Sequence, residues 1–546
     1  MAVFAPAVPP GPLPPGARWR FDADSLRLAG FFTLSDLLAR LPGVYVARGG
    51  FFGQAENVLY AGRGPAALEV YWDGIPYVPL GRDSLYLDPA RIPLAPLEQV
   101  EVSRLPGVLR VYLVTQRQAS TQAASSVGVS SGDRNLTRYA GRFARRWRSG
   151  AGLSLAFDQH ALNGAPATSS SGFNDQSLWL NAEIAREGRF GISGQLLSST
   201  WERDPEANLV DHWRYGRTDA MVRVFMTARP DGLGVRFQFA AAQTTAKRDS
   251  AVPARHSQVA VLDAGITGRR ASLDATARVG GVTRRPEIEA RGSWTPLGGL
   301  GGAGLTLAAE ARQSEYRDGR LGRRAIGQIG LSLPLGFALR GEAVWSRDLQ
   351  AAALDTDPLQ ETLDLNAAAR WDGRWATLEV GAGRRDGFLP MKAPAGLRTI
   401  ANLRATPITN TLTVYGSIRP TRWVTVSGWY FDPINGGGDF EPPHHARVAA
   451  TFFSRFLRVF RSGIFALRGN VAVESWSGWT AGLDTLGGPL ELIGATFMDV
   501  DFGLQIGGVT AFWTMRNANA MRASYAPGLG YPKEIQYWGV RWDFRN

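Results

Sequence analysis

Apolar and polar residues alternate with a period of two along most of the chain after about residue 120. In the stretch 287–294 the even-numbered residues are apolar or small, whereas most odd-numbered residues are charged. The stretches 362–371 and 537–544 alternate in the same way. Because successive side chains of a β-strand point to opposite faces, this pattern predicts strands between an apolar and a polar medium. A soluble β-sandwich and a membrane β-barrel both satisfy that condition.

The lengths of the connections distinguish these two folds. Outer-membrane barrels have short periplasmic turns and long outer loops, whereas a sandwich has no reason to alternate. Here short and long connections do alternate; the short ones include 187–188, 230–232, 268–270, 372–374 and 419–421, and the long ones include 160–174, 203–212, 348–358, 433–444 and 475–496. We therefore predict a membrane all-β fold, an antiparallel transmembrane β-barrel of about 22 strands over residues 119–546.

Aromatic residues support the membrane barrel. All but two of the 17 tryptophans follow residue 119, and many stand near predicted strand ends. An aromatic girdle at each membrane interface would place them there. The chain has no run of eighteen apolar residues, so the sequence predicts no transmembrane helix.

Three linked segments before the barrel predict a small α+β unit. Residues 33–46 predict a short amphipathic helix with an N-terminal capping pair and a Pro-Gly pair at its end. Residues 57–77 predict two strands joined by an Asp-Gly turn. Residues 91–116 predict two further strands, 99–103 and 109–115.

Four motifs in this unit resemble the plug domain of TonB-dependent outer-membrane receptors. In order, they are LLxxLPGV (37–44), Arg63-Gly64, VxxDGxP (70–76) and IPxxxxExVEV (92–102). The resemblance implies a plug over residues 30–118 in the barrel lumen, an outer-membrane location with outer-membrane lipids as neighbours, and a TonB-type energy-coupling protein of the periplasm as partner. The aromatic final strand, closing on Phe544, is similar to the signal read by the barrel-assembly machinery.

The sequence departs from the family's pattern in two places. Residues 103–116 run almost directly from one strand into the next, which implies a shortened plug. Residues 1–29 are proline-rich and predict an extended tether, in which neither a secretory signal nor the family's coupling segment is recognisable. An alternative therefore stays open: an uncoupled passive pore, or a surface-exposed binding barrel with a reduced plug.

Composition and motifs exclude several classes of function. The net charge is +12, but the basic residues are scattered, which argues against nucleic acid as a partner. There is no cysteine, no phosphate-binding glycine loop and no His-Glu-x-x-His motif, so we expect no enzyme and no cofactor. Only His444 and His445 are adjacent among the five histidines, and neighbours on a strand point apart, so we expect no metal site. The positive charge suits either anionic solutes or the phosphates of outer-leaflet lipid.

The resemblance implies that outward plug loops contact an imported solute. The candidate ligand-binding residues are Arg48, Phe51, Phe52, Gln54, Arg63 and Arg82. Arginine beside exposed phenylalanine suits a ligand that is anionic and partly aromatic or apolar. Alternatively, the two phenylalanines pack inside the plug. The expected function is import of a scarce solute, such as a siderophore-like compound, an oligosaccharide, a peptide or another organic ligand, without covalent chemistry.

The predicted plug is too small to hold its position without the wall. We expect polar contacts between plug charges and lumen-facing wall charges; the plug residues are Arg63, Asp73, Glu98 and Glu101, and the wall residues are Glu287, Glu289, Arg291, Asp364 and Arg370. Wetted contacts of this kind contribute about 0–1 kcal/mol each.

Overall fold

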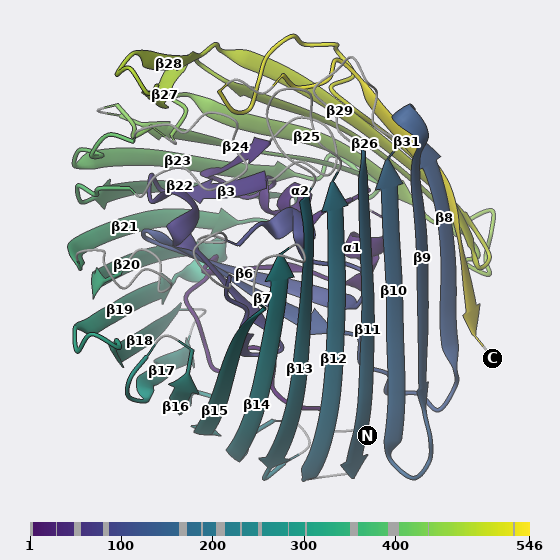
Figure 1. Cartoon of the computed structure of the whole chain (residues 1–546), viewed down its shortest axis with the longest axis horizontal. Coiled ribbons are helices and arrows are strands. Elements are labelled where there is room, and N and C mark those ends of the chain that lie inside the picture. The colour runs from purple at the N-terminus through teal and green to yellow at the C-terminus, as the bar shows by residue number, and fades with distance from the viewer. Residues whose placement is uncertain are drawn as a thin grey trace.

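The computed structural model contains a closed antiparallel barrel with a smaller unit inside it (Figure 1). It describes residues 4–28, 30–48, 56–79, 87–162, 172–186, 189–203, 213–229, 232–248, 254–281, 283–300, 303–349, 359–390, 403–434, 436–439, 441–527 and 530–545. Each barrel strand pairs with its neighbours, and the last strand pairs with the first. The predicted fold class is confirmed.

Twenty-two strands form the barrel. They are β8 (Ala124–Gly132), β9 (Leu136–Arg146), β10 (Ala151–Leu162), β11 (Phe173–Arg186), β12 (Phe190–Arg203), β13 (Trp213–Thr227), β14 (Gly234–Arg248), β15 (Arg255–Thr267), β16 (Ala271–Gly280), β17 (Glu287–Leu300), β18 (Ala303–Glu315), β19 (Leu321–Ser332), β20 (Phe337–Asp348), β21 (Gln360–Asp372), β22 (Ala376–Arg385), β23 (Thr409–Ile418), β24 (Val424–Pro433), β25 (His445–Ser454), β26 (Phe465–Trp476), β29 (Ala495–Ile506), β30 (Val509–Arg516) and β31 (Ile535–Arg545). Among the described residues no helix is long and apolar enough to cross a membrane.

The alternation along the strands separates a lipid face from a lumen face. Ile288 and Trp294 are 59% and 53% exposed on the outside of β17, whereas Glu289 between them is 1% exposed. Most long connections lie at one end of the barrel, which we call the long-loop end, and most short ones lie at the other, the short-turn end. The ten-residue connection 455–464 between β25 and β26 is an exception at the short-turn end.

Arginine on the lipid face of β29 should impair insertion strongly. We expect Phe502→Arg to destabilise the folded barrel by about 2–4 kcal/mol, because this side chain faces hydrocarbon. Gly503 is the matched control, since it faces the lumen and an added Cβ would have no atom within 4 Å. Gly539 also faces the lumen but is unsuitable, because an added Cβ would lie 2.5 Å from the carbonyl oxygen of Val129. Urea titration of folding into lipid vesicles measures both variants, and equal losses would contradict the assignment of the faces.

Single cysteines can test which end faces outward, because the chain contains no cysteine. Leu486 lies in a tight turn at the long-loop end and Leu335 in a tight turn at the short-turn end, and both are well exposed. An impermeant thiol reagent added to intact cells should label Leu486→Cys but not Leu335→Cys. The reverse result would invert the orientation.

The plug contains a five-stranded sheet in the order β1-β6-β7-β4-β5. Its elements are β1 (Arg18–Phe21), α1 (Ala23–Leu28), α2 (Leu34–Leu38), β2 (Val44–Arg48), β3 (Glu56–Tyr60), η1 (Gly64–Ala67), β4 (Leu68–Trp72), β5 (Ile75–Pro76), η3 (Pro89–Arg91), β6 (Leu97–Leu105) and β7 (Val108–Thr115). The leucines of α2 are fully buried against the sheet. The helix predicted in 33–46 ends at Leu38, before its expected Pro42-Gly43 stop, and residues 44–48 then pair with β3.

The proline-rich N-terminus does not hang free of the barrel. Residues 4–17, which we call the N-terminal strap, lie against the inner wall, where Ser272 near the short-turn end of β16 donates to the carbonyl oxygen of Pro10 at 3.4 Å. Strand β1 then joins the plug sheet. Arg340 of β20 donates to the carbonyl oxygen of Pro15 at 2.9 Å, and Arg117 donates to that of Ala5 at 3.1 Å. A proline has no N–H but keeps its carbonyl acceptor, so arginine donors can hold such a segment without a sheet.

Candidate functional site

The plug contacts three parts of the wall in three different ways. On the side of β11 to β15, apolar wall residues join the plug's own core; they are Trp179, Leu197, Met221, Ala240 and Val261. On the side of β18 to β21, and at β30, ion pairs join plug and wall. A small apolar cluster of Leu105 and Val108 with Ile326 and Val344 lies among them on β19 and β20. On the side of β8, β9 and β29 to β31 a crevice lies between part of the plug and the wall, and beside it Phe32 of the plug packs against Tyr537 of β31.

The most extensive ion-pair cluster surrounds Glu69 of β4. Arg110 of β7 donates to Glu69 at 3.0 Å and makes two 2.8 Å hydrogen bonds to Glu310 of β18. Arg312 and Arg324 of the wall also pair with Glu69. Burial raises the pKa of Glu69, but these three arginines outweigh it and hold the pKa well below its usual range.

A second cluster joins the plug to β21. Arg63 pairs with Asp364 at 2.6 Å, and both side chains are less than a tenth exposed. The guanidinium of Arg63 also lies 4.5 Å from the ring centre of Phe388. Next to it, Arg385 donates to the carbonyl oxygen of Ala61 at 3.2 Å. Arg63 and Asp364 both belong to the charges that the sequence predicts at the plug–wall contact, although the sequence did not assign them to each other.

A third cluster fixes α2 to β30. Asp36 caps the helix by accepting the backbone N–H of Thr33 at 3.0 Å, and it pairs with Arg48 at 3.0 Å and with Arg516. Burial raises the pKa of Asp36, yet the two arginines lower it to about 2. Arg48 forms a second ion pair with Glu56 at 3.1 Å. The Asp36 carboxylate therefore serves both as a helix cap and as an anchor to the wall.

Several predicted pairings differ from the structure. Glu98 and Glu101 pair with the plug's own Arg117 and Arg18 rather than with the wall. Asp73 accepts a 2.8 Å hydrogen bond from Gln195 of β12. The expectation of wetted contacts is wrong, because the ion pairs that join plug and wall are largely buried. Sequence alternation identifies lumen-facing charges, but it does not tell which distant charge each one meets.

An aromatic cluster covers the plug at the long-loop end. Tyr45 of β2 donates a 2.6 Å hydrogen bond to the carbonyl oxygen of Tyr525 and packs edge-on against Trp476 and Trp479. Trp479 begins β27 (Trp479–Leu483), which forms a hairpin with β28 (Pro489–Leu492) beyond the barrel end (Figure 1). The long connections therefore reach the plug directly.

His445 lies under this cluster rather than in a solvated loop as its sequence position suggests. It is 1% exposed, its Nε2 lies 2.9 Å from Glu474, and its ring packs edge-on to Trp429 and Trp476. The sequence considered His445 only as a metal ligand and did not point to Tyr45; an aromatic residue directly after the LPGV motif was the available signal. In the described part of the chain no group of three or more His, Asp or Glu residues could hold a metal ion.

The six candidate ligand residues divide into two groups. Arg48 and Arg63 are buried in the ion pairs described above, so their guanidinium groups do not face an open cavity. Phe51, Phe52, Gln54 and Arg82 lie outside the described residues. Their contact with a ligand, and the alternative that both phenylalanines pack inside the plug, stay predictions.

Comparison with known proteins agrees with this architecture. The sequence profile of the TonB-dependent receptor plug domain matches residues 14–110. The siderophore receptor PirA from Acinetobacter baumannii superimposes with a TM-score of 0.72 at 10% identity, covering 97% of this chain and 98% of that one. The chain has the fold of a TonB-dependent receptor.

Two further receptor and transporter structures share the fold. The ferric enterobactin receptor PfeA from Pseudomonas aeruginosa gives a TM-score of 0.71 at 10% identity, covering 97% of this chain and 99% of that one. The FrpB iron transporter from Neisseria meningitidis gives 0.70 at 10% identity, with the same coverages. No curated protein matches the sequence. These structures are receptors and transporters, and at 10% identity their likeness to this chain is one of fold.

Proposed function

We propose that this receptor imports a scarce organic solute across the outer membrane, and that movement of the plug against the wall opens the path. The unequal plug–wall interface carries this proposal. Apolar packing on one side can act as a fixed support, whereas ion pairs can separate once water solvates the two charges. On the remaining side a crevice of about 130 Å³ already lies between part of the plug and the wall.

The crevice has a cationic lining that suits an anionic solute. It is lined by Arg27 of α1, Arg142 of β9 and Arg541 of β31, with Asp501 as an acidic neighbour. Plug and wall meet here through hydrogen bonds to backbone carbonyl oxygens of the plug. Arg541 donates to Arg27 at 3.1 Å, Tyr537 to Gly30 at 2.6 Å and Arg142 to Leu94 at 3.5 Å. We therefore propose that the path opens along β8, β9 and β29 to β31.

We propose Phe51, Phe52, Gln54 and Arg82 as the outward contacts to the solute. Arg48 and Arg63 would then fix the plug segments next to these residues through their ion pairs, and would not contact the solute. PirA is a siderophore receptor and PfeA a ferric enterobactin receptor. A siderophore-like chelate is therefore the first solute class to test, ahead of oligosaccharides and peptides.

Binding of the energy-coupling partner tests the proposal. The purified periplasmic domain of a TonB-type protein should bind the full-length chain in detergent, as measured by titration calorimetry. A variant that lacks residues 4–17 is the comparison, because it shows whether the strap contributes to that contact. If the domain does not bind the full-length chain, the alternative of an uncoupled binding barrel or pore replaces coupled import.

A further inference from the structure

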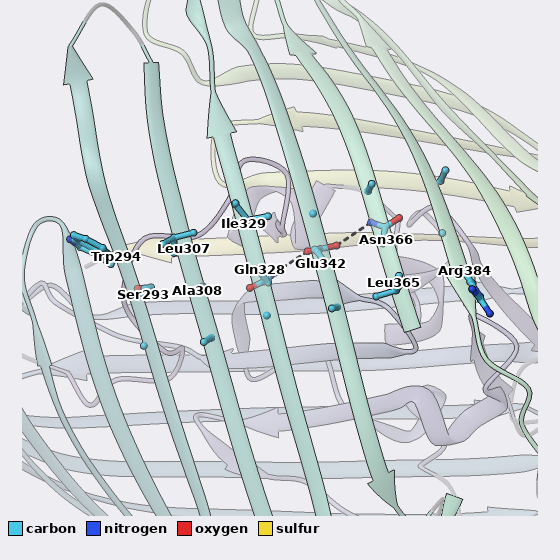
Figure 2. A pocket seen from close by; sticks show the side chains of 18 of the residues that line it. Ser293, Trp294, Leu307, Ala308, Gln328, Ile329, Glu342, Leu365, Asn366 and Arg384 are labelled. Atoms are coloured by element: carbon cyan, nitrogen blue, oxygen red, sulfur yellow. Dashed lines mark hydrogen bonds between the residues drawn. The ribbon is translucent and has the colours of Figure 1, made fainter. Parts of the chain in front are cut away.

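The lipid-facing side of the wall carries an apolar groove between β16 and β24. Its floor is a row of small residues on adjacent strands, Gly292, Ala309, Gly327 and Ala343. The next row toward the short-turn end is bulky and contains Trp294, Leu307 and Ile329. Figure 2 shows Trp294 at one end of the groove and Arg384 at the other.

The polar residues behind the groove belong to the lumen. Glu342 accepts hydrogen bonds from Gln328 at 2.8 Å and from Asn366 at 3.1 Å (Figure 2). These three side chains therefore satisfy one another on the inner face. The outer face of the groove presents aliphatic and aromatic surface together with the side chains of Arg384 and its cross-strand partner Asn410.

Three arginines stand on this same outer face near the long-loop end. Arg323 and Arg347 are direct cross-strand partners on β19 and β20, and Arg384 of β22 borders the groove. All three are exposed, and none has an acidic partner within the described part of the chain. The nearby Glu361, opposite Arg347, accepts a hydrogen bond from Trp345 at 3.1 Å instead.

Glu361 offsets only part of the positive charge of these three arginines, because it lies beside Arg347 alone. Like charges that face each other across two strands repel, and arginine on a lipid face is costly except near the interface. An anion supplied from the membrane would remove the repulsion. Guanidinium groups match phosphate oxygens in a bidentate geometry, so phosphate is the best complement.

We propose that the groove and the three arginines form one binding site for a phosphate-bearing, acylated lipid of the outer leaflet. The phosphate lies between Arg323 and Arg347, and an acyl chain follows the small-residue row. Arg323 and Gly327 are four residues apart on β19, which is about 13 Å along a strand. A single lipid spans that distance, and the site is independent of the proposed import function.

Other occupants fit the observations less well. A free phosphate ion would meet the arginines but would leave the groove without a role. A second copy of the barrel, docked through this face about a twofold axis, would bring the two arginine sets together. Charge complementarity therefore favours a lipid that carries both a phosphate and a hydrocarbon chain.

Native mass spectrometry of the purified full-length protein tests the site. Phosphatidylglycerol should remain bound, and phosphatidylcholine with the same acyl chains should bind about tenfold more weakly, because its net charge is zero. The Arg323→Gln/Arg347→Gln double variant should lose the preference for phosphatidylglycerol. Added inorganic phosphate should not displace the lipid, because it cannot occupy the groove.

Substitutions in the groove test the contribution of its shape to lipid binding separately from the contribution of the arginine charges. Gly327→Leu keeps all three arginines and should fold, because an added Cβ at Gly327 has no atom within 4 Å, but its side chain should obstruct the acyl chain. The matched control is Gly194→Leu, a lipid-facing glycine of β12 with equally open space. Arg145→Gln neutralises an exposed arginine at the opposite end of the wall and should change nothing.

Three results would overturn the proposal. The first is that the unaltered protein retains phosphatidylglycerol and phosphatidylcholine equally. The second is that the folded Gly327→Leu and Arg323→Gln/Arg347→Gln variants retain phosphatidylglycerol as well as the unaltered protein does. The third is that inorganic phosphate alone displaces the lipid. A shift to dimers that Gly327→Leu abolishes would instead identify a second copy as the occupant.

Discussion

Deletion of residues 4–116 should convert the protein from a closed barrel into a wide, permanently open pore. Every barrel strand pairs with another barrel strand on both sides, so the wall satisfies its own backbone hydrogen bonds without the plug. A barrel of 22 strands encloses a lumen much wider than its side chains can fill. Single-channel recordings in planar bilayers should show a conductance at least about ten times that of the intact protein.

The control for this deletion is removal of the strap alone. A variant that lacks residues 4–17 keeps the plug sheet, including β1, and should stay closed if the sheet provides the seal. If the intact protein conducts as well as the variant without residues 4–116, the short plug does not seal the lumen. The passive pore would then be the better description.

The barrel was predictable because its signal is local. Each strand repeats an alternation of lipid-facing and lumen-facing residues within about ten positions, as Ile288 and Glu289 show. The plug was predictable because four short motifs occur in a fixed order. Helix α2 ends at Leu38, although its apolar pattern continues to Leu41 before the Pro42-Gly43 stop. The pairing of Val44 to Arg48 with β3 is a contact that the helical pattern does not reveal.

Contacts between distant segments were not predictable in the same way. Glu69 and Arg324 are separated by 255 residues, and nothing near either residue encodes the pairing. The strap resembles a free tether because its carbonyl acceptors find their donors only on the folded wall, at Arg340 for example. The buried position of His445 depends likewise on Trp429 and Trp476, which belong to two other strands.

Replacement of Glu69 by glutamine should loosen the plug more than any other single change in its ion pairs. The neutral amide would leave the positive charges of Arg110, Arg312 and Arg324 close together without the Glu69 carboxylate. Removing one partner of a buried ion pair costs about 3–5 kcal/mol of stability, because the other charge stays buried without compensation. Urea should therefore open the channel at a lower concentration in Glu69→Gln than in the unaltered protein. Bilayer conductance recorded against urea concentration measures the shift.

Glu98→Gln is the matched control for this change. Glu98 is also a plug glutamate beside an arginine, but its partner Arg117 belongs to the plug and both side chains are more than a quarter exposed. An exposed pair of this kind contributes about 0–1 kcal/mol, so the urea response should hardly change. Equal shifts for the two variants would show that the Glu69 cluster does not hold the plug to the wall.

Lowering the pH should weaken the attachment of the plug through the same Glu69 cluster. The folded-state pKa of Glu69 lies well below its ordinary value of 4.5, because the three arginines favour the carboxylate. Its stabilising contribution is therefore complete above pH 4.5 and is lost only as the pH falls through the lowered folded-state pKa. The unaltered plug should become easier to release by urea over that acidic range, and Glu69→Gln should lack this part of the pH dependence. An identical acid response in both proteins would assign the loss of stability to other carboxylates, such as Asp36.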